Sequence, residues 1–177
     1  MRRTAIALSV IAAAFLASAP ATAAPAGGDT GTAAGRGWEP VPSLPWDVSA
    51  GLRCDFPVHG EAVVDEVVRH VLDTYPDGSV KRAAYRGDLV VRVTNSATGA
   101  SYDADAGGRA IVEYRPDGSQ HWSVRGPVLV GFGQAGGTLA RGLYIIDGVY
   151  TMDIGVTGHK TVTMVHASSD DLCARID

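Results

Sequence analysis

Polar and apolar residues alternate along several stretches after residue 54, and this is the pattern of β-strands that bury one face. The segments 119–125, 143–155 and 161–166 are the clearest cases, and 89–94 is rich in β-branched residues, which favour strands. A β fold is therefore the first prediction. The residues expected to share inward faces are Gln120, Trp122, Val124, Tyr150, Met152, Ile154, Val162, Met164 and His166.

Glycine-containing turns separate these stretches. Residues 75–79 and 116–119 both contain Pro-Asp-Gly-Ser, 95–99 supplies another turn, and Asp147-Gly148 is typical of a tight hairpin that would divide 143–155 into two arms. The two Pro-Asp-Gly-Ser sequences lie forty residues apart, but their flanks do not match, so we interpret them as two similar hairpins and not as a repeat.

The segment 61–73 fits two structures. Its valines recur at the spacing of an amphipathic helix, but valine loses rotamer freedom in a helix and favours strands. Asp65-Glu66 would then form a turn between two strands, which would place His70 opposite Glu61. The pattern alone leaves helix and strand open.

The amino-terminal part has a different composition. Arg2 and Arg3, an apolar run and an Ala-x-Ala sequence predict a signal peptide over 1–23. Residues 24–50 are rich in Gly, Ala and Pro and are predicted to form a disordered linker. Two tryptophans of this linker either rest against the domain or contact a partner. Residues 51–177 form the predicted β-barrel-like domain.

Charge and cysteine content narrow the function classes. The formal net charge is −4 and becomes more negative once Arg2 and Arg3 are removed, so nucleic acid is not an expected partner. Two cysteines in an exported chain predict one disulfide, between Cys54 and Cys173. We therefore expect a secreted, extracellular, monomeric protein that does not bind a membrane after signal cleavage.

The sequences Cys54-Asp55-Phe56-Pro57-Val58, Val93-Thr94-Asn95, Arg125-Gly126-Pro127 and Asp171-Leu172-Cys173 lie in an order that resembles a group of uncharacterised secreted actinobacterial proteins. This resemblance implies an all-β meander closed by one disulfide, and it favours strand for 61–73. It implies no catalytic residue. With about eight antiparallel strands and short turns, we expect a closed up-and-down barrel, with a two-sheet sandwich as the alternative.

The sequence motifs that could indicate a nucleotide site or a metal site are weak. Gly131, Gly133 and Gly136 satisfy G-x-G-x-x-G, but a strand is expected to follow them where a nucleotide site needs a helix. Asp103 and Asp105, which precede two glycines, resemble part of a calcium loop, but a third oxygen ligand is missing. The histidine spacing indicates no zinc site. We therefore predict no metal and no cofactor.

The leading hypothesis is a non-catalytic binding module that holds a small apolar ligand inside the barrel. The residues predicted to line this cavity are Trp122, Tyr150, Met152 and His166. One alternative is an extracellular hydrolase that uses His121, Ser123 or Asp103 at the barrel mouth, although the group that would orient the histidine is not evident. Another is a protein-interaction module that uses the Pro/Trp-rich linker at 38–46.

Overall fold

The computed structural model describes residues 37–134 and 136–177. The predicted signal peptide and the first part of the predicted linker lie outside these residues. The described chain is all-β, apart from one four-residue helix, α1 (Leu172–Arg175). No helix in this part is long and apolar enough to cross a membrane.

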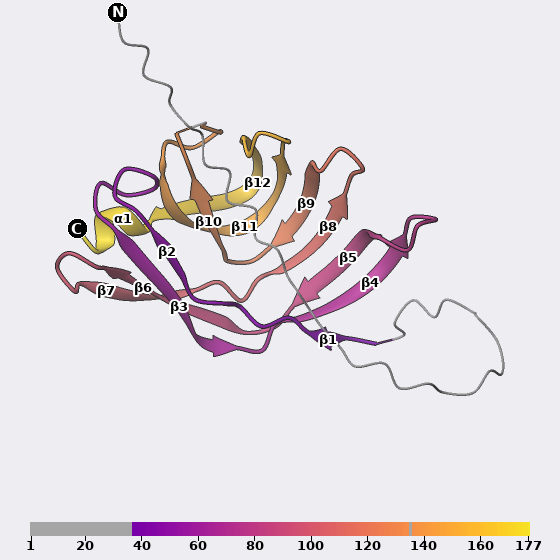
Figure 1. Ribbon diagram of the computed structural model, residues 1–177, viewed down its shortest axis with the longest axis horizontal. Helices are drawn as coiled ribbons and strands as arrows, with labels where there is room; N and C mark the ends of the chain where they lie inside the picture. The colour runs from indigo at the N-terminus through magenta and orange to yellow at the C-terminus, as the bar shows by residue number, and fades with distance from the viewer. Residues whose placement is uncertain (1–36, 135) are drawn as a thin grey trace, which may run out of the picture. The chain divides into compact units, whose positions relative to one another are not determined.

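The strands form two antiparallel sheets (Figure 1). The larger sheet has the order β1-β4-β5-β8-β9-β11-β10, with β12 paired to the other side of β11, and the smaller has the order β2-β3-β6-β7. The strands of the larger sheet are β1 (Glu39–Pro40), β4 (Val68–Thr74), β5 (Val80–Arg86), β8 (Arg109–Tyr114), β9 (Gln120–Arg125), β10 (Val128–Phe132), β11 (Gly142–Ile154) and β12 (Lys160–Asp171). Those of the smaller sheet are β2 (Trp46–Val48), β3 (Val58–Asp65), β6 (Leu89–Asn95) and β7 (Ser101–Asp105).

Most of these strands are halves of longer strands that bend at one line, which we call the crease. β3 continues into β4, β5 into β6, β7 into β8 and β9 into β10, each after two or three residues. Backbone hydrogen bonds join neighbouring bends, for example from Glu66 N to Asp88 O and from Gly126 N to Gly148 O, both 2.8 Å. The crease is therefore a continuous, hydrogen-bonded feature of the meander.

Glycine is required where neighbouring segments of the backbone approach each other closely at the crease. Gly87 and Gly148 have φ of 139° and 122°, and a Cβ atom on either would lie 2.1 Å from the carbonyl oxygen of Glu66 or His166. Side chains rarely adopt such φ values, and the carbonyl oxygens leave no space for one. Asp147-Gly148 is therefore a bend inside the single strand β11, and the predicted hairpin turn at this position is wrong.

The larger sheet contains three equivalent hairpins, β4-β5, β8-β9 and β11-β12. Their turns begin at Tyr75, Arg115 and Gly155, forty residues apart, and have the same hydrogen bonds. In each turn the first residue's N–H bonds the carbonyl oxygen four residues on, and the fourth residue is a glycine with φ between 81° and 85°. The third turn lacks Pro-Asp-Gly-Ser, which is why the sequence indicated only two hairpins.

The two sheets separate at the crease. β8 and β9 are paired, whereas their continuations β7 and β10 belong to different sheets. Apolar residues of the smaller sheet, such as Val93, pack against Leu143 and the helix residue Leu172 in one core cluster. A second core cluster lies on the other face of β10 and of the first half of β11. There these strands pack with the inner face of β8, of β9 and of the rest of β11, and the cluster includes Phe132 and Tyr150.

The all-β prediction is confirmed, but the described strands form no closed barrel, and a sandwich describes the face-to-face packing at least as well. The segment 61–73 is strand, as β3 and β4, and not helix. However, β3 and β4 enter different sheets, so His70 lies opposite Ala84 and Glu61 lies opposite Arg92.

The predicted linker at 24–50 includes two short edge strands, β1 and β2. The two tryptophans of this segment rest on the domain, which was one of the two interpretations of the sequence. Trp38 lies 5.5 Å from the ring of His70, measured between centroids, and Trp46 covers the backbone of Gly60. Leu44, between them, is 79% exposed.

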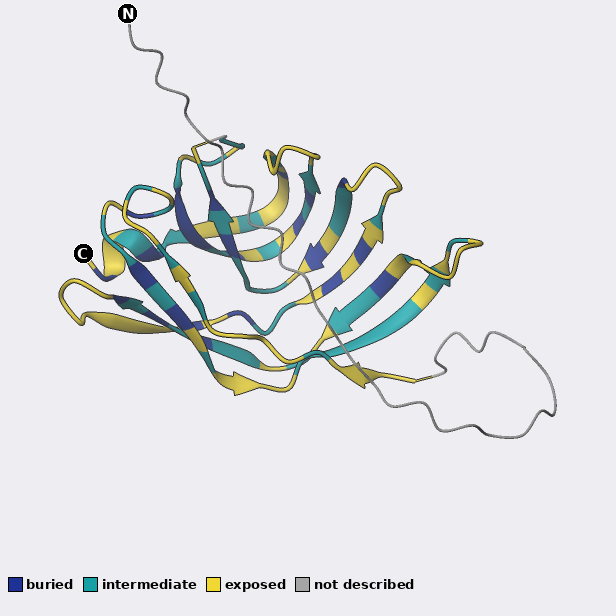
Figure 2. Cartoon of the chain, viewed as in Figure 1, coloured by how far each residue is buried: buried dark blue, intermediate teal, exposed yellow. Residues whose placement is uncertain are grey.

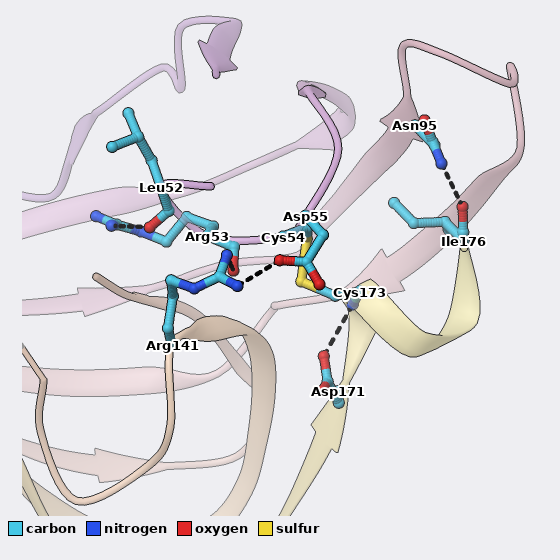
Figure 3. The surroundings of a disulfide bond; sticks show 9 residues. All are labelled: Leu52, Arg53, Cys54, Asp55, Asn95, Arg141, Asp171, Cys173 and Ile176. Carbon is cyan, nitrogen blue, oxygen red and sulfur yellow. Dashed lines mark hydrogen bonds and ion pairs between the residues drawn. A yellow bond between two sulfur atoms is a disulfide. The ribbon is translucent and has the colours of Figure 1, made fainter. Parts of the chain in front are cut away.

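The predicted disulfide is present and joins Cys54 to Cys173 (Figure 3). Arg141 contacts the carboxylate of Asp55 and donates to the carbonyl oxygen of Arg53 at 3.0 Å. Asn95, buried in β6, donates to the carbonyl oxygen of Ile176 at 3.0 Å. The carboxyl terminus is therefore fixed to both the segment before β3 and the smaller sheet.

Candidate functional site

A shallow apolar groove of about 480 Å³ lies on the outer face of the larger sheet, opposite the core. Its floor comes from the halves of the three hairpins that lie next to the crease. Ile111, Val149 and Val165 are 44%, 39% and 62% exposed there, and exposed apolar residues that gather in one patch are typical of binding sites. Exposed and buried residues alternate along β8 in Figure 2, as expected for a strand with one solvated face.

Three arginines line one side of this groove, and we call them the arginine row: Arg86, Arg109 and Arg125. Arg109 and Arg125 are directly opposite each other on β8 and β9. Tyr85 is opposite Ala110, so the same register places Arg86 beside Arg109. Each arginine is the strand residue next to the crease, since Gly87, Gly108 and Gly126 are their chain neighbours.

The arginine row has no acidic partner. Across the described residues, no ion pair or hydrogen bond involves the side chain of Arg109 or Arg125, and the guanidinium of Arg86 lies over the ring of Trp38. Five other arginines of the described chain are paired with acids. These pairs are Arg69 with Glu39, Arg92 with Asp103, Arg115 with Asp153, Arg141 with Asp55 and Arg175 with Asp170.

Trp38 forms the wall of the groove at the β4 end. The guanidinium of Arg86 lies 4.0 Å from the centroid of its ring, a cation–π contact. β1 holds Trp38 in this position by pairing with β4, and Glu39 accepts two hydrogen bonds from Arg69, at 2.9 and 2.6 Å. The short strand from the predicted linker is therefore part of the groove.

Hydroxyl groups and a histidine continue the outer face away from the arginine row. Ser123 and Thr151 are opposite each other and line the groove. One position further toward the turns, His121 Nδ1 donates to Asp153 at 2.9 Å. This hydrogen bond from His121 lowers the pKa of Asp153, and Arg115 adds to the effect.

The structure brings together two of the three residues of the hydrolase hypothesis. His121 and Ser123 share the outer face of β9, and Asp153 is the orienting carboxylate that the sequence did not reveal. No hydrogen bond joins Ser123 to His121 in the described chain. Asp103 lies in the smaller sheet, where it accepts two hydrogen bonds from Arg92, at 2.7 and 2.8 Å.

The four residues predicted to line an internal cavity fall into two places. Trp122, Tyr150 and Met152 belong to one core cluster, in which Tyr150 and Met152 are fully buried. A β-bulge in β12 shifts the register, so that His166 is opposite Val149 on the outer face and not beside the other three. The hydroxyl of Tyr150 has no hydrogen-bond partner among the described residues, and burial raises its pKa.

The weaker motifs have structural roles. Gly131 and Gly133 lie against the side chain of Arg53 and lead from strand β10 to strand β11, where a nucleotide site would need a helix. Asp105 accepts a hydrogen bond from the backbone of Gly107 at 2.9 Å, and Asp103 is paired with Arg92. No group of three or more His, Cys, Asp or Glu side chains that could hold a metal occurs among residues 37–134 and 136–177.

Comparison with protein-family models gave no match, and comparisons with curated proteins and with solved structures gave no significant match. The sequence analysis missed the arginine row, although a signal for it exists. Arg86-Gly87, Gly108-Arg109 and Arg125-Gly126 are arginine–glycine pairs at the ends of β5, β8 and β9, and only the pairing of these strands aligns them.

Proposed function

We propose that this domain is a non-catalytic extracellular binding module and that its ligand occupies the groove beside the arginine row. One observation carries this proposal: an apolar groove is lined by aligned arginines without acidic partners. Its volume, about 480 Å³, is within the range of small-molecule sites, which are mostly apolar with a few polar groups that orient the ligand.

The extracellular part of the proposal rests on the predicted signal peptide and on the disulfide, a bond that persists in oxidising compartments. The resemblance to secreted actinobacterial proteins stays a prediction. The proposed site is on the outer face of the larger sheet, so it does not depend on the internal cavity that was predicted around Trp122, Tyr150 and Met152.

Filling the groove tests this proposal. Ser123 is exposed on the groove floor, so Ser123→Trp would occupy the groove from the solvent side and leave the core unchanged. Thr161→Trp adds the same bulk to the same face, outside the groove, and is the matched control. Native mass spectrometry of protein purified from its own host should show a ligand adduct on the wild type and on Thr161→Trp but not on Ser123→Trp.

The bare polypeptide mass for all three proteins, together with no binding of small amphiphilic probes, would overturn the proposal. Circular dichroism and melting curves of the two variants show whether each has folded. An adduct that persists in Ser123→Trp would place the ligand elsewhere, with the predicted internal cavity as the next candidate.

A hydrolase is the second candidate, and the hydrogen bond between His121 and Asp153 favours it, because such a carboxylate orients a histidine base. The experiment compares His121→Ala and Ser123→Ala with the wild type on p-nitrophenyl acetate. Loss of turnover in both variants would support an enzyme. Equal, background rates in all three proteins would exclude this site.

A further inference from the structure

We propose that the groove binds a small amphiphilic anion, and that Arg109 and Arg125 together hold its carboxylate or sulfate group. This inference rests on the proposed function and adds the chemical class of the ligand. The two guanidinium groups come from directly opposite positions on adjacent strands. Cβ atoms at such positions lie about 4.5–5.5 Å apart, so both side chains can reach one anion.

The arginine row carries a concentrated positive charge on adjacent strands. Like charges directly opposite each other destabilise an antiparallel pair, and the register places Arg86 beside the same pair. The chain has 19 acidic and 15 basic residues, so acids that could neutralise the row are plentiful. The fold instead pairs acids with other arginines, for example Asp103 with Arg92. An anionic ligand would supply the missing countercharge.

The chemistry of arginine indicates what kind of anion fits. A guanidinium presents a planar set of donors that matches the two oxygens of a carboxylate or the oxygens of a sulfate, and such charge-assisted bonds are stronger than neutral ones. The hydroxyl groups of Ser123 and Thr151, one position further from the crease, can donate to the same headgroup.

The rest of the groove is apolar, so the remainder of the ligand should be apolar too. Ile111 and Val149 flank the arginine row and are exposed, and Trp38 closes one end with an aromatic ring. A highly hydrated anion such as free phosphate would leave these surfaces uncovered. A short alkyl or aryl chain that carries one anionic group would cover the apolar floor and neutralise the row.

Three decyl probes of different charge test this inference: decanoate, decyltrimethylammonium and decyl maltoside, each below its aggregation concentration. Isothermal titration calorimetry of the wild type should show binding of decanoate, weaker with added sodium chloride, and no comparable binding of the cation. The double variant Arg109→Gln/Arg125→Gln should bind decanoate roughly tenfold more weakly or worse, since bonds to charged groups are lost.

Arg82→Gln is the matched control, because Arg82 is on the same face of β5 but outside the groove. It should leave decanoate affinity within about twofold of the wild type. Equal binding of the three probes, abolished by Ser123→Trp but unchanged in the double arginine variant, would overturn the anion inference and leave the binding module intact.

Absence of binding by all three probes would overturn the inference as well. If a ligand adduct were still seen on protein from its host, the binding module would survive this result. Flotation with phosphatidylglycerol vesicles separates a free anion from a membrane surface. Binding to vesicles without binding to monomeric decanoate would show that a lipid surface, and not a single small anion, is the partner.

Discussion

Breaking the disulfide between Cys54 and Cys173 tests how much of the domain's stability comes from one cross-link. The bond joins residues 119 positions apart, so it closes a loop that spans all the strands from β3 to β12. Its loss would restore a large amount of conformational freedom to the unfolded chain, whereas the folded chain retains other contacts at this end, such as the bond from Asn95 to Ile176.

The loop length sets the expected magnitude. The chain-entropy relation gives about 4.9 kcal/mol at 25 °C for a loop of this length. A domain of about 140 residues has an entropy of unfolding of roughly 0.3 kcal/mol/K, so the melting temperature should fall by about 16 °C. This is a large share of the 5–15 kcal/mol that is typical for the stability of a domain, which is why the reduced form should melt well below the oxidised form.

Differential scanning calorimetry of the wild type with and without tris(2-carboxyethyl)phosphine is the measurement. The variant Cys54→Ala/Cys173→Ala should melt near the reduced wild type and should not respond to the reductant. Cys54 is 2% exposed, so in folded, reduced protein the Cys54 thiol should react slowly with a thiol reagent such as Ellman's reagent.

A fall of less than about 4 °C on complete reduction, with free thiols counted after denaturation, would refute this reasoning. Such a small fall would mean that the covalent bond adds little stability beyond the noncovalent contacts that hold the carboxyl terminus. Decanoate binding should be unchanged by reduction at a temperature where both forms are folded, because the groove is on the larger sheet, away from the disulfide.

Three further substitutions test the crease, the core and the outer face. Gly148→Ala should lower the unfolding free energy by roughly 2 kcal/mol or more in urea titrations, because its Cβ would lie 2.1 Å from the carbonyl oxygen of His166; an unchanged midpoint would contradict this. Tyr150→Phe should raise the unfolding free energy by about 1 kcal/mol, since it removes a buried hydroxyl without a partner, and a clear loss of stability would reveal a partner for that hydroxyl. The hydrogen bond from His121 lowers the pKa of Asp153 below its usual 3.8. The contribution of the ionised Asp153 carboxylate to stability is therefore complete above pH 3.8 and is lost as the pH falls through the lowered pKa. Asp153→Asn should therefore flatten the acid limb of a melting-temperature profile below about pH 4, and identical acid limbs would show that the interaction adds nothing.

Local sequence patterns predicted several of the strands but not how they combine. Alternation identified β9, the second half of β11 and the first half of β12, and Pro-Asp-Gly-Ser identified two of three equivalent turns. The third turn, Gly155 to His159, was not predicted because its sequence shares with the other two turns only the glycine with positive φ at the fourth position. Asp147-Gly148 was misread because a glycine with positive φ occurs both in hairpin turns and in bends within a strand.

The candidate site depends on pairing between strands, which a single sequence does not contain. His166 was assigned to the inner face because alternation assumes a regular strand, and the bulge in β12 reverses this assignment. Arg109 and Arg125 are sixteen positions apart in sequence and become neighbours only in the β8–β9 register. Asp153 orients His121 through the pairing of β11 with β9, which the sequence also did not reveal.

The three hairpins have nearly equal lengths from turn to crease, with seven residues in β4 and β5 and six in β8 and β9, and this has a consequence for the charge on the outer face. The alignment of Arg86, Arg109 and Arg125 is set by backbone register, and the apolar residues on the inner face hold that register. A slip by one residue would relieve the repulsion but would turn the core side chains toward water. The unliganded protein therefore cannot relax its charge by rearranging its strands, and only screening ions or a bound anion can neutralise it.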